Sequence, residues 1–281
     1  MTVDISLGPP PELRFRRKVA LCASLKALWR ARQLVRSLAE RDLRARYKQA
    51  LLGFGWAVVP PLATVLVFTV LFDRVANIDT QGTPYVLFSY LGLLPWTFFS
   101  SSVAAAAASL VGNVSLLNKV NCPREIFPVT AIVVSAVDAA LSGVVLVALF
   151  AVTGRAPRVT ALWAPLYLVV SVAFTVAVSL LMSIIVVYLR DLRHALPLIL
   201  QLGLFATPVV YGLNVISPSW VEVYVVANPM AAVIDGYRRT ILLGLAPDWE
   251  FLGLAAASSA LLLVGSYALF RRLETGIADV A

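Results

Sequence analysis

The junction of a basic stretch with a long apolar one, RDLRARYKQALLGFGWAVVPPL at 41–62, constrains this chain more than any other feature. Four of its first eight residues are arginine or lysine, and no further charge follows until Asp73. Basic residues collect where a chain leaves a negatively charged cytoplasmic membrane face and enters lipid. The junction therefore predicts the start of the first membrane crossing and its direction, outward from the cytoplasm.

The composition indicates an integral membrane protein. Of the 281 residues, 60% are hydrophobic and 14% charged, with a mean hydropathy of +0.87, whereas soluble domains are about 45–50% apolar and roughly 25% charged. The net charge is +8, and 12 of the 23 lysines and arginines precede residue 49. This clustering at the membrane edge favours anionic lipid as a partner, and no nucleic acid is expected.

Six apolar runs approach the roughly 20 residues that a helix needs to cross a bilayer. Inside lipid they must be helices, because unpaired backbone groups are costly there. With a cytoplasmic N-terminus and six crossings, 18 lysines and arginines lie inside and five outside, as the positive-inside rule requires. We therefore expect an all-α polytopic membrane protein with six transmembrane helices and both termini in the cytoplasm. The runs are approximately 54–72, 85–112, 126–153, 161–189, 195–211 and 251–270.

The segment before the first crossing divides into a leader and a helix. Residues 1–24 are expected to be a disordered cytoplasmic leader, and residues 25–48 an amphipathic helix in the membrane interface, ahead of the transmembrane domain at 49–281. The alternative for the helix is packing on a partner protein. Its apolar face carries Leu25, Leu28, Trp29, Val35, Ala39, Leu43 and Tyr47.

Between the fifth and sixth runs, residues 218–244 form two short apolar pieces that are each too short to span. Asn228 and Pro229 are typical of an N-cap followed by a first-turn proline, and Gly244 is typical of a helix C-terminus. A single crossing here would put Arg271 and Arg272 outside, against the charge rule. We therefore predict a re-entrant helical hairpin that dips back from the outer face.

Asp138 is the one acid deep within an apolar run, and an ionised carboxylate there costs on the order of 2.5–3.5 kcal/mol. It is either a polar contact in a transport path or a hydrogen bond between helices or subunits. Aromatic residues at the run boundaries are either interface anchors or the lining of a passage for sugars. The candidates for such a lining are Phe54, Trp56, Trp96, Phe205 and Tyr211.

Catalysis by this chain is not expected. No GxxxxGK[ST] motif occurs, so this chain is not expected to hydrolyse ATP itself. The lone His194 has no neighbouring ligand, and the two cysteines, Cys22 and Cys122, fall in segments expected in the reducing cytoplasm. We expect no metal, no cofactor and no disulfide here.

Four passages in this order resemble the transmembrane subunit of ABC-type polysaccharide exporters, which move O-antigen, teichoic acid or related glycans. The resemblance extends from about Arg41 to the C-terminus. One departure is Cys122, because family members usually carry an aromatic residue before the PRE motif. The passages are RDLRARYKQALLGFGWAVVPPL (41–62), NKVNCPREIFP (118–128), YLRDLRHALPLILQLGLFATPVVY (188–211) and NPMAAVIDGYRRTILLG (228–244).

The resemblance implies a homodimer that works with two copies of an ATP-binding subunit, which would hold the ATP and magnesium. It also implies a gate helix at 25–48, a coupling helix at about 115–125 that contacts the ATPase, and a polyprenyl-diphosphate-linked glycan as substrate. The implied coupling residues are Lys119, Pro123, Arg124, Glu125, Arg190, Asp191 and Arg193. The implied diphosphate residues are Arg41, Arg44, Arg46 and Lys48, and those of the outer gate are Asn228, Pro229, Asp235 and Arg238.

Three alternatives stay open. The first is the same permease family with another cargo, such as a capsular polysaccharide, a drug or a lipid. The second is a membrane-embedded polyprenyl-phosphate transferase, which would need clustered acids or histidines at one membrane face. The third is a secondary transporter without an ATPase. In every case the expected location is the cytoplasmic membrane.

Overall fold

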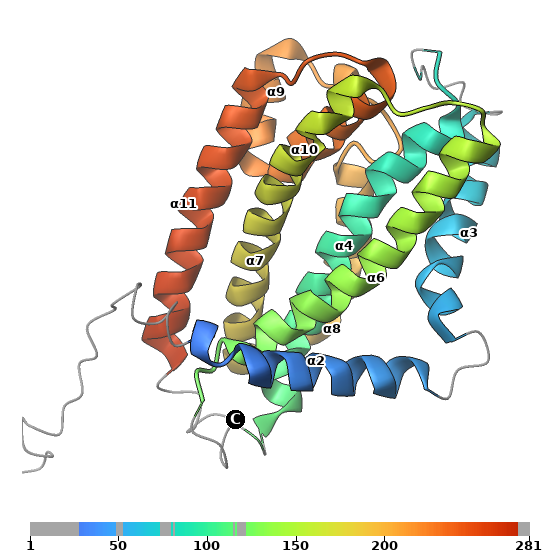
Figure 1. The fold of residues 1–281 in the computed structure, drawn as a ribbon. Coiled ribbons are helices and arrows are strands. Elements are labelled where there is room, and N and C mark those ends of the chain that lie inside the picture. Colours follow the sequence, from blue (N-terminus) through green and yellow to red (C-terminus); the bar gives the residue numbers. More distant parts are fainter. Residues whose placement is uncertain are drawn as a thin grey trace, which may run out of the picture.

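The computed structural model describes residues 28–48, 53–73, 80, 82–114, 116 and 122–274, and within these ranges the secondary structure is entirely helical (Figure 1). The predicted all-α class is confirmed. The α-helices are α2 (Arg32–Tyr47), α3 (Val59–Phe68), α4 (Tyr85–Gly112), α6 (Ile126–Val152), α7 (Ala164–Tyr188), α8 (Leu192–Ala206), α9 (Pro218–Ala227), α10 (Pro229–Tyr237) and α11 (Trp249–Leu273). Shorter 3₁₀ and π segments are η2 (Gly53–Ala57), η3 (Thr69–Asp73), η4 (Val159–Trp163), η5 (Leu213–Val215) and η6 (Arg238–Leu243).

Five helical segments in the described part of the chain are long and apolar enough to cross a membrane. Their ends lie within three residues of the predicted runs, because the charged and turn-forming residues that interrupt hydrophobicity also end the helices. The five segments are Gly55–Phe72, Tyr85–Gly112, Ile126–Val152, Val159–Tyr188 and Trp249–Leu273.

The fifth predicted run, 195–211, differs from the expectation. Its helix, α8, has 15 residues and ends at Ala206, which is shorter than the roughly 20 residues of a full crossing. Thr207 is extended, with φ −94° and ψ 143°, because the ring of the following Pro208 disfavours helical backbone in the residue before it. The chain continues beyond α8 as a non-helical segment.

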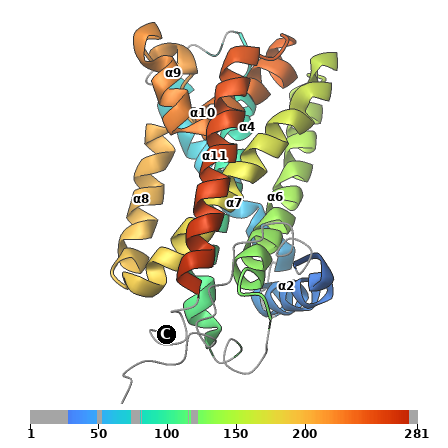
Figure 2. The same ribbon diagram turned by 90° about the vertical axis from the view of Figure 1, so that its left-hand side faces the viewer.

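The long helices run side by side, and α2 lies crosswise at one end of the bundle (Figure 1). The C-terminal end of α11 and the turn between α7 and α8 lie at this same end, whereas α9 lies at the opposite end (Figure 2). We call these the α2 end and the α9 end. The chain ascends from the α2 end along α8 and descends again along α11 (Figure 2).

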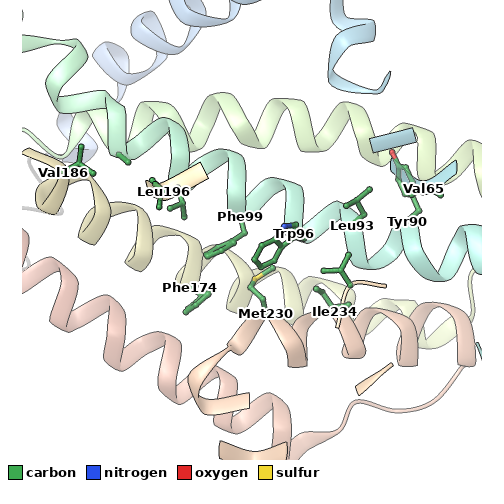
Figure 3. Packing of buried hydrophobic residues seen from close by; sticks show 13 residues of the cluster. Val65, Tyr90, Leu93, Trp96, Phe99, Phe174, Val186, Leu196, Met230 and Ile234 are labelled. Atoms are coloured by element: carbon green, nitrogen blue, oxygen red, sulfur yellow. The ribbon is translucent and has the colours of Figure 1, made fainter. Parts of the chain in front are cut away.

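Helix α4 is at the centre of the bundle and packs against α3, α6, α7, α8 and α10. Its side chains Leu93, Trp96 and Phe99 meet residues of α7 and α10, among them Phe174 and Met230 (Figure 3). Phe99 stacks on Phe174 with 5.3 Å between ring centroids. The outward faces of α3, α6, α7, α8 and α11 also carry large apolar residues, as expected for helices surrounded by lipid rather than water.

Helices α9 and α10 form a helical hairpin at the α9 end. Pro229 begins α10 as predicted, and Gly244 ends η6 with φ +74°, a left-handed conformation that favours glycine. The side chain of Asn228 does not cap α10. It donates instead to Thr207 Oγ1 at 2.8 Å, so the predicted N-cap bond is wrong and the residue ties the hairpin to the segment after α8.

Candidate functional site

Of the basic residues predicted for the diphosphate, Arg41, Arg44 and Arg46 lie on the last two turns of α2, and Lys48 directly follows the helix. Arg36 pairs with Glu40 at 2.9 Å, Arg44 lies 4.0 Å from the same carboxylate, and Arg41 pairs with Asp42 at 2.9 Å. All are well exposed, so these pairs contribute little, about 0–1 kcal/mol. The charge of this surface therefore remains available to an anion.

Helix α2 is held to the bundle by its less polar face, on which Val35, Ala39 and Tyr47 are buried. It packs chiefly against α6. Trp29 of the predicted apolar face is 70% exposed instead, with the guanidinium of Arg32 lying 5.5 Å from the centroid of its ring. Leu25 lies outside the described residues.

Asp138, in the middle of α6, binds the end of α2. Its Oδ1 accepts a hydrogen bond of 2.6 Å from the Tyr47 hydroxyl, and its Oδ2 accepts one from the Arg46 guanidinium. Burial, followed by the hydrogen bond to Asp138 and its charge, raises the pKa of Tyr47 to about 12, so the phenol remains a donor at physiological pH. Of the two interpretations of Asp138, the structure shows a hydrogen bond between helices of one subunit.

A groove of about 410 Å³ opens beside this contact. Arg46, Tyr47 and Asp138 line it, and so does Trp56 of η2, which is 52% exposed. The remaining lining residues are Ala57, Pro60, Pro61, Thr97, Phe98, Ser101, Ser135, Ala139 and Ser142. A guanidinium, several hydroxyls and an exposed indole suit a ligand that has both an anionic group and a sugar ring.

The other aromatic residues predicted to line a passage are dispersed. Trp96 is 5% exposed and packs within the core against Phe99 and close to Gly203 (Figure 3). Phe205, on the outer face of α8, is 49% exposed, and the hydroxyl of Tyr211 donates to its carbonyl at 3.1 Å. The side chain of Phe54 lies outside the described residues. Of the four whose side chains are described, Trp56 alone lines the groove beside α2.

At the α9 end, Arg238 is 2% exposed and surrounded by backbone carbonyls. It donates to Phe88 O at 3.0 Å, Pro208 O at 2.7 Å and Tyr211 O at 2.8 Å, and also to Val209 O. Its guanidinium carbon lies 3.7 Å from the centroid of the Phe88 ring. This predicted gate residue thus fixes the irregular segment after α8 onto α4.

Two other predicted gate residues lie nearby. Asp235 is half-buried and lines a cavity of about 160 Å³ together with Arg238, Arg239 and Thr83. Asn228 binds Thr207 in the same irregular segment. Asn228 and Arg238 thus both bind the segment 207–211, whereas Asp235 faces the cavity beside Gly212 and Asn214. The π-helical turn η6, of a kind often found at functional sites, begins at Arg238.

At the α2 end, Glu125 of the predicted coupling segment is buried, at 3% exposed. Its Oε1 accepts from Arg271 at 3.1 Å and from the Tyr267 hydroxyl at 3.2 Å. Arg271 also pairs with Glu274 at 2.7 Å, and burial, followed by the charge of Glu125, raises the pKa of Glu274. Glu125 thus points into the protein and joins the start of α6 to the end of α11.

The other predicted coupling residues lie around this cluster. Pro123 and Arg124 are half-buried, and Lys119 lies outside the described residues. Arg190, Asp191 and Arg193 are exposed at the turn between α7 and α8, and the hydroxyl of the adjacent Tyr188 donates to Leu273 O at 2.8 Å. Both predicted coupling segments are therefore attached to the end of α11.

No pattern in the sequence indicates the roles of Tyr267, Arg271 and Glu274. Two basic residues after an apolar run, such as Arg271 and Arg272, are what the positive-inside rule expects, so Arg271 does not stand out. Because Arg271 lies far from Glu125 in the sequence, no local pattern indicates that the two residues pair. The pair is seen only once the start of α6 and the end of α11 pack together.

Arg271→Met is expected to lower the free energy of unfolding by about 3 kcal/mol, because Glu125 would keep a buried charge without its guanidinium. Thermal unfolding of the detergent-solubilised protein measures the change. The exposed neighbour Arg272→Met is the control, and adding Glu125→Gln should recover part of the loss. Equal effects of the two arginine substitutions would contradict this assignment.

These features define a polytopic helical membrane protein with a basic crosswise helix at one end and a helical hairpin at the other. The ABC-2 type transporter family matches residues 33–242. This match covers more than half of the chain, and the chain belongs to that family.

Several curated relatives match over almost the whole chain. The O-antigen export system permease protein RfbA of Myxococcus xanthus is 32% identical over 91% of this chain and 98% of the relative. A protein of the same name from Klebsiella pneumoniae is 26% identical over 86% and 93%. The polysialic acid transport protein KpsM of Escherichia coli is 23% identical over 85% and 93%.

Proposed function

We propose that this chain is the membrane subunit of an ATP-driven exporter that moves a polysaccharide, carried on a polyprenyl diphosphate, across the cytoplasmic membrane. The full-length similarity to O-antigen export permeases supports polysaccharide as the cargo. O-antigen, galactan or teichoic-acid-like polymers all belong to this class. The chain itself is not the ATPase.

The observation that carries the proposed lipid head group is the basic end of α2 beside the groove at Asp138. Arg46 lines this groove and is 45% exposed, and Arg41, Arg44 and Lys48 belong to the same end of α2. Guanidinium groups bind phosphate oxygens through two parallel hydrogen bonds. Trp56 lines the same groove and offers the attached sugar an exposed indole.

We propose six crossings, in which α8 together with the segment 207–216, which is non-helical up to η5, makes the fifth. The ascent of the chain along α8 (Figure 2) and the position of α11's end beside α2 support this topology. The α9–α10 hairpin is then re-entrant from outside, and α2 is an amphipathic helix in the inner interface. A reporter fused after Ala281 tests this, because a signal from the outer face would rule out six crossings.

The proposed assembly is a homodimer with two copies of an ATP-binding subunit that carries the ATP and magnesium. Both predicted coupling segments, around 122–125 and 190–193, lie at the α2 end, which suits a partner on the cytoplasmic side. Closure of the ATPases would pull on these segments and move the helices as rigid bodies. A lateral opening between the first and fifth crossings would then admit the head group, with the glycan at the dimer interface.

Depletion of this chain in its native host is the direct test. We expect polyprenyl-diphosphate-linked glycan to accumulate on the inner leaflet and the surface polymer to disappear, and analysis of the accumulated sugar would identify the cargo. Loss of surface polymer without accumulation of a diphosphate-linked intermediate would contradict the proposed head group.

Export of a capsular polysaccharide on another lipid anchor is the second candidate. The similarity to KpsM, a polysialic acid transport protein, favours it. The same depletion experiment separates the two, because the accumulated lipid anchor would then lack a polyprenyl diphosphate. A small drug or lipid cargo would leave surface polymer unchanged.

A further inference from the structure

The end of α11 binds the first predicted coupling segment, around 122–125, through buried charges. Glu125, 3% exposed, directly precedes α6, and its Oε1 accepts from Arg271 at 3.1 Å. Arg271 also pairs with Glu274 at 2.7 Å, and the side chains of these two residues are 12% and 11% exposed. Separating such a pair is costly, because it leaves a buried charge uncompensated. A displacement of the start of α6 is therefore passed on to the end of α11.

The second predicted coupling segment is joined to the same helix end. Tyr188, the last residue of α7, lies just before the turn at 190–193, and its hydroxyl donates to Leu273 O at 2.8 Å. Helix α11 also packs along α7. Phe270 of α11 and Ile184 of α7, both 0% exposed, lie in one apolar cluster. The ends of α7 and α11 thus form a single packed unit.

Helix α6 is joined to this unit in another way. In the described part of the chain, α6 packs along α4, makes few contacts with α7 and fewer still with α11. Phe127, on the first turn of α6, reaches the apolar cluster of Phe270, and beside it Glu125 binds Tyr267 and Arg271. The contacts of Glu125 are therefore the direct polar link between the first coupling segment and the unit that carries the second.

We propose that the end of α11 makes the two coupling segments one rigid body, and that Arg271 is the positioning residue that holds the first segment in it. Closure of the ATPases would then move α6 and α7 together. Without Arg271, the segment 122–125 would shift alone, and ATP would be hydrolysed with less export. This inference rests on the proposed function, because it needs an ATP-binding subunit that contacts both segments.

The first measurement follows the distance between the two segments and does not depend on the cargo. Spin labels are attached to the native Cys122 and to an introduced cysteine, His194→Cys, after Cys22→Ser has removed the other native thiol. Complexes with the ATPase and one labelled protomer are compared in nanodiscs, without nucleotide and with ATP trapped by vanadate. We expect the distance to stay the same when Arg271 is present and to shift by about 2 Å or more in Arg271→Met.

The second measurement is the amount of glycan exported per ATP hydrolysed in proteoliposomes. A loss of folded complex lowers export and hydrolysis together, so this ratio does not depend on stability. Arg271→Met is expected to lower the ratio roughly tenfold. Adding Glu125→Gln removes the stranded charge and should recover stability, but the ratio should stay low. Arg272→Met, the same charge change at an exposed neighbour, should retain the wild-type ratio.

The inference is wrong if the distance changes between the two states while Arg271 is present, because the segments then move separately. It is also wrong if the double variant regains the wild-type ratio along with its stability, or if neither Arg271 variant assembles, since the pair then serves only the fold. A wild-type complex that exports no glycan contradicts the proposed cargo, whereas a distance shift confined to Arg271→Met still supports the inference. If no ATP-binding subunit copurifies, the proposed function fails, and the inference fails with it.

Discussion

Arg238→Met is expected to lower the free energy of unfolding by on the order of 5 kcal/mol, because hydrogen bonds from a charged donor contribute about 1.5–3 kcal/mol each. Four backbone carbonyls, of Phe88, Pro208, Val209 and Tyr211, would lose that donor. Three of the four, those of Pro208, Val209 and Tyr211, lie in the irregular segment after α8, where no helix supplies a replacement donor. Thermal unfolding in detergent and proteolysis of the 207–217 segment measure the effect.

Arg239→Met is the control, since this neighbour makes one exposed bond, to Ala246 O at 2.8 Å, and should cost less than about 1 kcal/mol. Gly92→Ala, on α4, tests the packing around the Arg238 guanidinium. An added Cβ would lie 2.5 Å from this guanidinium and 2.7 Å from Val209 O. Gly143→Ala, which meets nothing within 4 Å, is its matched control. Similar stability of the Gly92→Ala and Gly143→Ala variants would argue against tight packing around the Arg238 guanidinium.

The double substitution Arg44→Glu with Arg46→Glu is expected to abolish export, with transport falling at least about tenfold, because both charges at the proposed diphosphate site are reversed. The variant should still copurify with its ATPase. Surface polymer and inner-leaflet intermediate are measured together in cells. Since a glutamate at position 46 would face Asp138, the double glutamine variant is included to remove the charges without adding repulsion.

Arg32→Glu with Arg36→Glu makes the same charge change at the other end of α2. If the basic surface served only to hold the helix on anionic lipid, both pairs of substitutions would reduce export equally. A loss confined to the 44 and 46 pair would support a specific phosphate contact. Normal export by the Arg44→Glu, Arg46→Glu variant would rule out a role of Arg44 and Arg46 in binding the diphosphate.

Much of the helical framework follows from local patterns. The limits of α4 and α6 agree with the apolar runs 85–112 and 126–153 to within one residue, because in lipid any long apolar run must satisfy its own backbone by forming a helix. Pro229 and Gly244 marked helix ends for equally local reasons, a fixed φ in one case and a left-handed one in the other. Pro208 indicates the early end of α8, because a proline disfavours helical backbone in the residue before it. The apolar run continues past Pro208, so its length alone predicted a longer helix.

Sequence by itself determined that this is a helical membrane protein, where five of its long helical segments begin and end to within three residues, and which segment carries the basic charge. Tertiary structure alone decided the partners of its few buried charges. Three such contacts join residues that are far apart in the sequence. Arg46 and Asp138 are 92 positions apart, Arg271 and Glu125 are 146 apart, and Arg238 is about 30 positions from the carbonyls after α8. Helix formation depends on neighbours along the chain, whereas a buried charge must find its partner on whichever helix packing brings beside it.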